Sequence, residues 1–212
     1  MKKSFQKILQ GYHSFRENYA HGDKNLMQYL SHHGQKPQTM VVSCCDSRVD
    51  PALILQCDPG DLFVVRNIAN IVPPNEKDGT HHGTSAALEF GIRFLNIKHL
   101  ILLGHSQCSG IKALLKSCTL EQNDFITNWV SVIKLENPNL KTVDDYEKLA
   151  LQQSYDNCMN FPWIKEKVLE KKLTIHVWFF DIKTAQIFAY SHDQQKYSPL
   201  DSCPEYAENF SV

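Results

Sequence analysis

The sequence has almost no net charge and no long apolar run. Its 22 Lys and Arg residues are balanced by 23 Asp and Glu residues, which gives a formal net charge of −1 at pH 7. A balanced charge provides no general attraction to nucleic acid or to an anionic membrane surface. No apolar run reaches the ~18 residues that a membrane-spanning helix needs. We therefore expect neither a nucleic acid nor a membrane among the partners of this chain.

Internal repeats, low-complexity tracts and linker-like stretches are also absent, as is a glycine-rich phosphate-binding loop. With 212 residues, the chain is long enough to bury a sizeable core. We expect one domain over residues 1–212. It should consist of a helical N-terminal arm at 1–33, a core at 34–190 that holds the functional site, and a C-terminal tail at 191–212.

The N-terminal segment lacks the apolar stretch of a signal peptide. Two lysines follow Met1, but Gln6, Lys7 and Gln10 interrupt the apolar residues that come next. We therefore expect a cytoplasmic protein, in which thiols stay reduced. Seven cysteines are present. Those expected to remain free thiols are Cys45, Cys57, Cys118, Cys158 and Cys203.

Apolar, β-branched runs alternate with helical patterns along the chain. Strands are predicted at 39–43, 62–66, 99–103 and 173–182, with an edge strand at 186–190. Helices are predicted at 4–33, after Asp50-Pro51, at 83–95, from Cys108 to Lys116, and over most of 124–171 with breaks near Asn137-Pro138 and Phe161-Pro162. This alternation predicts an α/β fold, with a central, mostly parallel β-sheet of four to five strands flanked by helices.

Two short segments, Ser43–Arg48 and Gly104–Cys108, carry residues that suit a metal ion. Each follows a predicted buried strand. Ligand sites of open α/β sheets form at the carboxyl ends of the strands, so both segments should emerge at one edge of the sheet. Together they offer two thiolates and one imidazole. Three protein ligands leave a fourth position open, which is typical of a catalytic zinc and not of a structural one.

The first segment favours Cys44 over its neighbour Cys45 as a ligand. Side chains of an extended chain alternate between two faces. If residues 44–48 are extended, Cys44 shares a face with Asp46 and Arg48, and Cys45 lies on the other. The same alternation places an acid and an arginine beside the ligand.

The second segment supplies His105 and Cys108. Gly104 is expected to end the strand, and a helix is expected to begin near Ser106. Residues three apart lie on one face of a helical turn, so both side chains would point the same way. A histidine and a cysteine at this spacing are more often simply buried. It is the combination of the two segments that indicates zinc.

These motifs resemble those of the β-class carbonic anhydrases. The shared features are Cys44-x-Asp46-Ser47-Arg48, the segment FVVRNIAN at 63–70, the segment SAALEF at 85–90, and His105-x-x-Cys108. They keep the order and spacing of that family, and the resemblance covers residues 25–190. It implies a zinc lyase, with one Zn²⁺ per chain, that converts carbon dioxide reversibly to bicarbonate and a proton through zinc-bound hydroxide.

The resemblance also implies roles for individual residues. The implied zinc ligands are Cys44, His105 and Cys108. The implied catalytic pair is Asp46 and Arg48, with Arg48 holding Asp46 in place to orient the hydroxide. The implied or candidate substrate-pocket residues are Gln35, Phe63, Val65, Phe90 and Ser109. In this family the positions of Gln35 and Phe63 line the pocket of a neighbouring subunit, so a homodimer or a dimer of dimers is implied.

Two of these positions depart from plant-type members of the family. Phe90 stands where they have tyrosine, so one hydroxyl is missing. Ser109 stands where they have glycine, so the φ freedom of glycine is lost after the last ligand. Neither change removes a ligand, and an altered rate is expected in place of lost activity. Val65 and Phe90 fit ordinary core positions equally well, and Gln35 fits a solvated loop.

The family includes a subtype that bicarbonate gates. It has a tryptophan three residues before the first cysteine ligand and a tyrosine near the chain end. Here these positions hold Val41 and Phe180, and only the third partner, Arg66, is present. We therefore expect the ungated form with an open zinc. In the gated form, Asp46 would close onto zinc as a fourth ligand at low pH.

Two thiolates cancel the charge of Zn²⁺, whereas three neutral imidazoles leave it intact. A less positive centre acidifies water less, so activity should rise through mildly alkaline pH. Two rival functions stay open on the sequence alone. One is hydrolysis of a carbon dioxide analogue such as carbon disulfide, as in close relatives of the family. The other is a non-catalytic zinc-binding module in which Asp46 is a structural fourth ligand.

Overall fold

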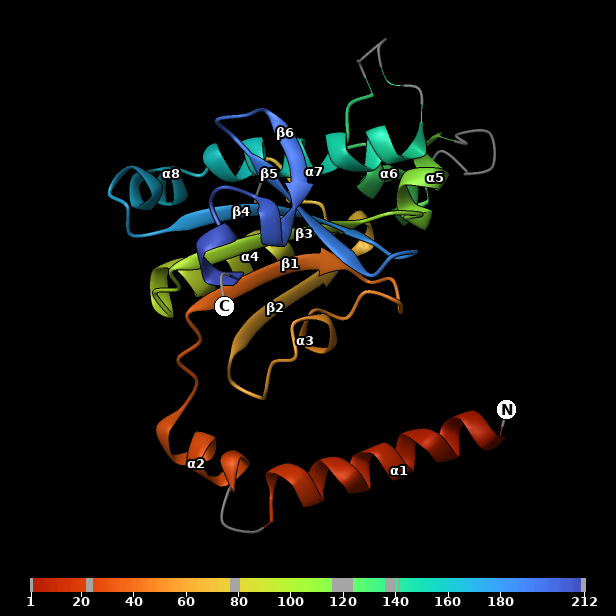
Figure 1. The fold of residues 1–212 in the computed structure, drawn as a ribbon, viewed down its shortest axis with the longest axis vertical. Helices are drawn as coiled ribbons and strands as arrows, with labels where there is room; N and C mark the ends of the chain where they lie inside the picture. The colour runs from red at the N-terminus through yellow and green to blue at the C-terminus, as the bar shows by residue number, and fades with distance from the viewer. Residues whose placement is uncertain are drawn as a thin grey trace.

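A six-stranded β-sheet forms the centre of the molecule, with strand order β2-β1-β3-β4-β5-β6 (Figure 1). The computed structural model describes residues 2–21, 25–76, 81–115, 124–135, 140 and 142–210. The strands are β1 Thr39–Cys44, β2 Leu62–Asn67, β3 His99–His105, β4 Thr174–Asp181, β5 Gln186–Ser191 and β6 Lys196–Pro199. Strands β1 to β4 are parallel, and β5 and β6 are antiparallel to their neighbours. The predicted mostly parallel α/β fold is confirmed.

The sheet has more strands than the four to five predicted. Strand β6 lies in the segment 191–212, where the sequence shows no recognisable motif, and it makes β5 an internal strand. Its four residues include Lys196 and Pro199, which disfavour a strand. Pairing with β5 stabilises the strand despite this low propensity. Tyr197 lies opposite Tyr190 of β5, and their ring centroids are 5.1 Å apart.

Helices lie on both sides of the sheet, and two N-terminal helices lie apart from it (Figure 1). They are α1 Lys2–Tyr19, α2 Leu26–His33, α3 Pro51–Ile54, α4 Gly83–Glu89, α5 Ser109–Leu115, α6 Phe125–Val130, α7 Val143–Met159 and α8 Pro162–Leu169. The predicted helix at 83–95 changes to a π-helical turn at Phe90–Phe94. Asp50 caps α3 as predicted, and the predicted break near Phe161-Pro162 separates α7 from α8. The predicted break near Asn137-Pro138 and the helix end at Lys116 lie outside the described residues.

Both faces of β1 and β3 are buried. Along β1, Met40 and Val42 belong to one apolar core, whereas Val41 between them belongs to a second core on the other face. Helices α4, α7 and α8 contribute to the first core, and α5 together with Ala150 of α7 contributes to the second. Strands buried on both faces account for the nearly continuous apolar runs in the sequence.

The N-terminal helices α1 and α2 lie apart from the sheet, beyond its β2 edge (Figure 1). At the end of α1, the Tyr19 hydroxyl donates a hydrogen bond to Asp58 (2.7 Å). Several apolar side chains of α1 are more than half exposed: Phe5, Ile8, Leu9 and Tyr12. An exposed apolar stripe of this kind is typical of a surface that contacts another chain.

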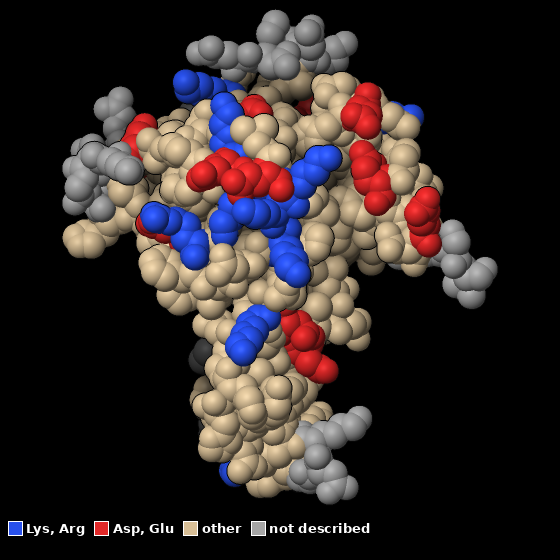
Figure 2. Space-filling view, turned by 90° about the vertical axis from the view of Figure 1, so that its left-hand side faces the viewer, with Lys and Arg blue, Asp and Glu red and all other residues tan. Residues whose placement is uncertain are grey.

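Cationic and anionic side chains lie next to one another on the face shown in Figure 2, in keeping with the balanced composition. None of the helices in the described part of the chain is both long enough and apolar enough to cross a membrane.

Close packing of α7 on β3 depends on Gly104. A Cβ atom at this position would lie 2.6 Å from Leu151 Cδ1. Packed side chains do not approach one another so closely. The absence of a side chain at Gly104 therefore lets α7 pack next to the carboxyl end of β3, beside His105.

We expect Gly104→Ala to lower the free energy of unfolding by about 1–3 kcal/mol, because the added methyl group forces Leu151 to move. Chemical denaturation followed by circular dichroism measures the change. Gly11→Ala in α1 is the matched control, since a Cβ there meets nothing within 4 Å and alanine favours a helix. An unchanged stability of Gly104→Ala would contradict the packing described.

Candidate active site

Three ligand-type side chains converge at the carboxyl ends of β1 and β3. Cys44 ends β1, His105 ends β3, and Cys108 follows in the turn before α5. Their ligand atoms all lie within 4.8 Å of one another, and the two sulfurs are 4.0 Å apart. The convergence follows from topology, because β1 and β3 are parallel neighbours with Ser43 paired to Leu103. The predicted meeting of the two motifs at one sheet edge is confirmed.

The path from His105 to Cys108 differs from the prediction. Strand β3 continues through His105, and α5 begins only at Ser109. Between them, Gln107 has a left-handed conformation with φ +60°, which turns the chain back towards β1. The Ser106 N–H donates to Phe180 O (2.9 Å), which keeps this residue beside β4 and delays the helix. A turn, and not one face of a helix, brings the two side chains together.

The first motif also forms a turn where an extended segment is predicted. Strand β1 ends at Cys44, and a turn at 47–48 follows. The Asp46 carboxylate causes this change, because it accepts hydrogen bonds from the Arg48 N–H (3.0 Å) and from Arg48 Nε (2.9 Å) and Nη2 (2.7 Å). The predicted proximity of Asp46 and Arg48 is present, although it arises from the turn. Cys45 is exposed, whereas Cys44 is buried.

The three side chains fit a tetrahedral metal ion such as zinc. The His105 Nδ1–H donates to the Ser106 carbonyl (2.8 Å), which leaves Nε2 as the acceptor. This Nε2 is buried and has no hydrogen-bond partner among the described residues. A buried acceptor without a partner is costly unless a ligand satisfies it. Two sulfurs on one tetrahedral zinc would be roughly 3.8 Å apart, which is close to the separation between Cys44 and Cys108.

The two buried thiols interact strongly. The pKa of the Cys44 thiol is lowered, because the Cys108 thiol donates to its sulfur and because His105 and the N–H groups of Asp46 and Ala69 also favour its thiolate. The pKa of the Cys108 thiol is raised, because its proton is held by Cys44 and it is buried. One thiolate is therefore favoured before any metal binds, and metal binding would displace the second proton.

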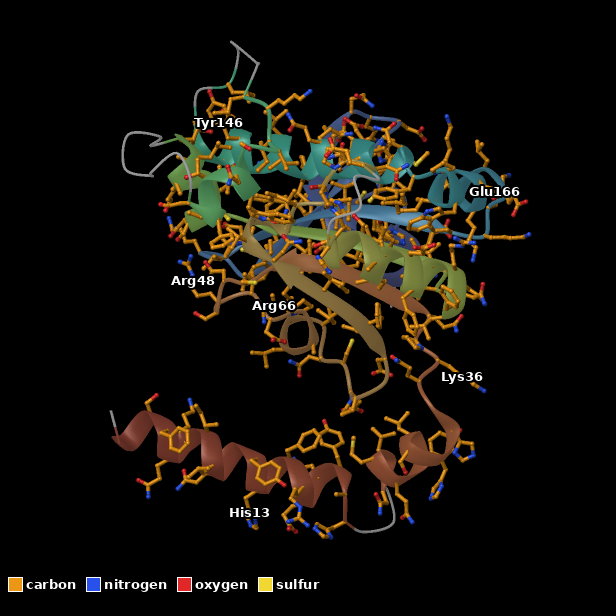
Figure 3. The ribbon with its side chains drawn as sticks, turned by 180° about the vertical axis from the view of Figure 1, so that it is seen from behind. His13, Lys36, Arg48, Arg66, Tyr146 and Glu166 are labelled. Atoms are coloured by element: carbon orange, nitrogen blue, oxygen red, sulfur yellow. The ribbon has the colours of Figure 1, made fainter. Side chains whose placement is uncertain are left out.

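Two arginines hold the first motif in place. Besides its contacts to Asp46, Arg48 Nη2 donates to the Gln107 carbonyl (3.3 Å), which joins the two motifs. Arg66 of β2 donates to the carbonyls of Cys44 (2.9 Å) and Asp46 (2.8 Å), and it pairs with Asp50 (2.9 Å). Both arginines lie on the same side of the molecule (Figure 3).

A hollow of about 390 Å³ lies beside the cysteine–histidine cluster. Residues 44–48 line it together with Ile68, Ser109 and Gly110. Ser109 is thus one predicted pocket residue that lies at the cluster. Ile68, which is 38% exposed, provides an apolar wall; it belongs to the segment FVVRNIAN but is not among the predicted pocket residues.

Three other predicted pocket residues lie elsewhere in the chain. Phe63 is near the start of β2, and its ring centroid is 5.9 Å from that of Phe90. Phe90 is 44% exposed. Val65 packs against the first apolar core, as an ordinary core residue would. None of the three lines the hollow beside Cys44, so their contribution to a substrate pocket stays a prediction, which for Phe63 concerns the pocket of a neighbouring subunit.

Gln35 also lies far from the cluster of its own chain. It precedes β1 and is exposed, whereas Cys44 is the last residue of β1. The strand between them is roughly 16 Å long. Lys36, the next residue, lies on the opposite side of the molecule from Arg48 (Figure 3). Any contact of Gln35 with an active site would therefore involve another subunit.

An acid that the motifs do not include lies beneath the cluster. Glu147 of α7 is buried, and its Oε1 accepts the Cys108 N–H at 2.6 Å. Burial raises the pKa of Glu147 to about 7. A sequence signal exists, because Glu147 occupies the apolar face of α7 at helical spacing from Ala150 and Leu151.

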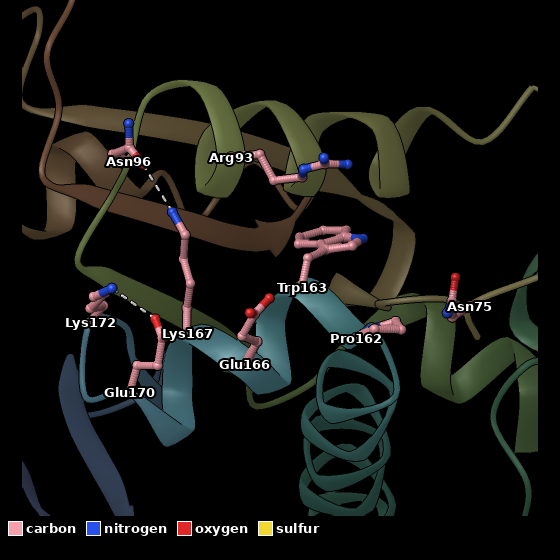
Figure 4. A pocket seen from close by; sticks show the side chains of 9 residues that line it. All are labelled: Asn75, Arg93, Asn96, Pro162, Trp163, Glu166, Lys167, Glu170 and Lys172. Carbon is pink, nitrogen blue, oxygen red and sulfur yellow. Dashed lines mark hydrogen bonds and ion pairs between the residues drawn. The ribbon is translucent and has the colours of Figure 1, made fainter.

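A larger hollow, of about 730 Å³, lies between α8 and the π-helical turn (Figure 4). Each cation that lines it already has a partner: Arg93 pairs with Glu89, Lys167 donates to Asn96, and Lys172 pairs with Glu170. It also lies towards the start of β3, away from His105. The cysteine–histidine cluster is therefore the better candidate for chemistry.

Comparison with known proteins identifies the family. The family model for carbonic anhydrase matches residues 39–187, which include Cys44, His105 and Cys108. A carbonic anhydrase of Synechocystis sp. is 32% identical over 220 residues, covering 95% of this chain and 79% of that protein. The chain belongs to the β-class carbonic anhydrases. Beta carbonic anhydrase 5 (chloroplastic) of Arabidopsis thaliana is 39% identical over 69% of this chain, and the match spans 52% of that protein, about half its length.

Solved structures of β-carbonic anhydrases share the fold. The structure of the β-carbonic anhydrase CcaA superimposes with a TM-score of 0.83 and 29% identity, covering 92% of this chain and 99% of that one. A β-carbonic anhydrase of Sordaria macrospora, described as tetrameric, has a TM-score of 0.74 and 29% identity, covering 88% of this chain and 96% of that one. The predicted family and fold are confirmed.

The contacts of Asp46 predict a pH dependence of stability. Hydrogen bonds from Arg48 lower the pKa of Asp46 well below its usual range in the folded protein. The ionised carboxylate therefore contributes stability above the unfolded-state pKa of about 3.9, and this contribution is lost as the pH falls further. We expect Asp46→Asn to lower the urea midpoint of the metal-free protein at pH 7 and to have a smaller effect at pH 3, because the contribution shrinks as the pH falls from about 3.9 towards the folded-state pKa of Asp46. Equal effects at both pH values would contradict the interaction.

Proposed function

We propose that the chain catalyses the reversible hydration of carbon dioxide to bicarbonate and a proton, as a zinc-dependent lyase. Cys44, His105 and Cys108 would hold one Zn²⁺ per chain. The observation that carries the proposal is their convergence beside a hollow that contains the paired Asp46 and Arg48. Membership of the carbonic anhydrase family supports the reaction.

A zinc ion with three protein ligands and an open position supplies an acidified water as nucleophile. The residues of the chain orient the reactants around it. Asp46 as a carboxylate accepts hydrogen bonds but donates none, so it can fix the direction of a reactant hydroxyl. The planar fork of Arg48 holds both Asp46 oxygens and keeps the carboxylate away from the ligand cluster.

The contacts of Asp46 and Arg66 support the ungated form. Asp46 faces Arg48 and does not belong to the group of converging ligand atoms. Arg66 is occupied by two carbonyls and by Asp50. Val41 and Phe180 provide neither the tryptophan nor the tyrosine of the gated subtype. We therefore propose that Asp46 does not close onto zinc at neutral pH.

We also propose that the enzyme is a homodimer or a dimer of dimers. The exposed apolar stripe of α1 would contact a partner subunit, and Gln35 and Phe63 would then line the partner's pocket. The ring of Phe90 stacks on Phe94, which is 68% exposed, and this surface supports the same assembly. Phe90 and Val65 would form apolar walls, and Ser109 would line the pocket of its own subunit.

We further propose that residues 1–212 act as one domain, with 34–190 as the catalytic core between the arm at 1–33 and the tail at 191–212. The tail supplies β6, so it would complete the sheet. A cytoplasmic location is supported by the cysteines of the described residues, which are free thiols: Cys44, Cys45, Cys57, Cys108, Cys158 and Cys203.

Zinc content tests the ligand set. We expect wild type to hold one zinc per chain after dialysis and Cys44→Ala to lose it, with metal measured by inductively coupled plasma mass spectrometry. Cys45→Ala is the matched control, because its thiol is exposed, and it should keep zinc. Asp46→Asn should also keep zinc. Loss of zinc from Asp46→Asn would favour the rival zinc-binding module, in which Asp46 is a structural ligand.

Stopped-flow hydration of carbon dioxide tests the reaction. Turnover of zinc-loaded wild type should rise from pH 6.5 to 9, because two thiolates reduce the acidity of the centre. Arg48→Ala should lower kcat/KM by roughly 100-fold, the cost of misplacing an orienting group. Arg93→Ala, which removes an exposed arginine paired with Glu89, should match wild type.

Three results would contradict parts of this proposal. A rate that is flat from pH 6 to 9 would contradict the expectation that two thiolate ligands make the zinc centre less acidifying. A steep loss below about pH 8 together with inhibition by bicarbonate would mean that Asp46 closes onto zinc. An absence of hydration by zinc-loaded protein would favour the hydrolase of a carbon dioxide analogue or the zinc-binding module.

A further inference from the structure

Glu147 is a buried carboxyl group attached to the metal-ligand turn from outside the motifs. It is 4% exposed, and it accepts the N–H of Cys108 at 2.6 Å. The Gln107 N–H also faces this carboxyl group and favours its charged form. The contact joins α7 to a turn 39 residues earlier in the sequence.

On grounds of stability alone, burial of this carboxyl group is unfavourable. A buried acid loses its hydration and needs partners that replace the lost hydrogen bonds. No ion pair of Glu147 is found within the described residues, and the adjacent Lys148 pairs with Asp144 instead (2.6 Å). Its neighbours on the same face, Ala150 and Leu151, are fully buried apolar residues. An apolar residue would suit the packing of α7 better, so packing does not explain why an acid occupies this position.

The turn itself provides that explanation. Gln107 is left-handed, with φ +60°, so the N–H groups of Gln107 and Cys108 can point towards one side of the turn and form a concave pair of donors. Glu147 occupies that concavity. Its hydrogen bond restricts rotation of the peptide unit that precedes Cys108. The direction of the Cys108 Cα–Cβ bond depends on this rotation.

We propose that Glu147 is a positioning residue that holds the turn at 106–108 so that the Cys108 sulfur meets the metal together with Cys44 and His105. The inference rests on the proposed zinc site. Glu147 touches neither substrate nor metal in this account, and it acts through the backbone of Cys108. Groups that orient metal ligands in this way typically contribute about 10- to 100-fold to metal affinity.

Zinc affinity of the full chain, measured by competition with a chromogenic chelator, tests the inference. Glu147→Ala should bind zinc about 10- to 100-fold more weakly than wild type. Glu147→Gln keeps an oxygen acceptor at the same position, so its affinity should lie within roughly threefold of wild type, well inside that range. Glu147→Met keeps the side-chain volume among apolar neighbours but removes the acceptor, so it should bind as weakly as Glu147→Ala.

Gln153→Ala is the matched control. Gln153 lies on the same helix and also braces a backbone segment, because it accepts from the Lys134 N–H (2.9 Å) and donates to the Lys134 carbonyl (2.7 Å). That segment is not part of the metal site. The control should therefore lose some stability and keep wild-type zinc affinity.

A spectroscopic readout separates positioning from general stability. Cobalt(II)-loaded wild type should show intense tetrahedral d–d bands and thiolate-to-metal charge transfer. Glu147→Ala and Glu147→Met should show weakened bands at saturating cobalt, whereas Glu147→Gln should retain them. Wild-type affinity and spectra in both Ala and Met variants would overturn the inference, as would equal weakening in Gln153→Ala or failure of Glu147→Gln to retain binding.

The same samples distinguish this inference from the proposed function. If wild type binds zinc but does not hydrate carbon dioxide, the proposed function fails, and the effect of Glu147 on zinc affinity is still measured. If wild type hydrates carbon dioxide and Glu147→Met binds zinc normally, the proposed function stands and the positioning role of Glu147 is wrong.

Discussion

The site depends on the parallel pairing of β1 with β3. Pairing of Ser43 with Leu103 brings the carboxyl ends of the two strands to the same edge, so residues 60 positions apart in the sequence become neighbours. Apolar side chains on both faces of the sheet fix that register, because a slip by one residue would exchange the side chains of two differently packed cores. Gly104 and Leu151 then allow α7 to approach β3 closely. The metal ligands are thus positioned by the packing of the core.

The negative charges at the site, on the Cys44 thiolate and on Asp46, are each stabilised by neighbouring groups. The Cys44 thiolate is favoured by a thiol and by backbone N–H groups, and Asp46 is held by Arg48 at the open side of the cluster. Arg66 and Glu147 contact backbone groups of the two motifs and not their ligand atoms. One therefore braces the end of β1 and the other the turn after β3. Together these contacts would keep three ligands converged and one position open for chemistry.

Much of this arrangement could be predicted from the sequence, because its signals are local. Apolar runs marked the strands, and Asp50-Pro51 marked the start of α3. The turns at 47–48 and 106–107 were not predicted, since they result from contacts of Asp46 with Arg48 and of Ser106 with Phe180. Strand β6 was missed because pairing with β5 stabilises it. Glu147 was missed because its partner lies 39 residues away, although an acid on an apolar helix face was a visible anomaly.

Cys44, His105 and Cys108 are proposed to bind one zinc and to leave one position open. Crystallography of zinc-loaded protein at pH 8, with anomalous data collected at the zinc edge, tests this arrangement most directly. We expect one metal peak with two sulfurs at about 2.3 Å, one nitrogen at about 2.0–2.1 Å and a solvent molecule as the fourth ligand. Asp46 should remain paired with Arg48. A metal bound by Asp46 as a fourth protein ligand, or one without Cys108, would contradict the account.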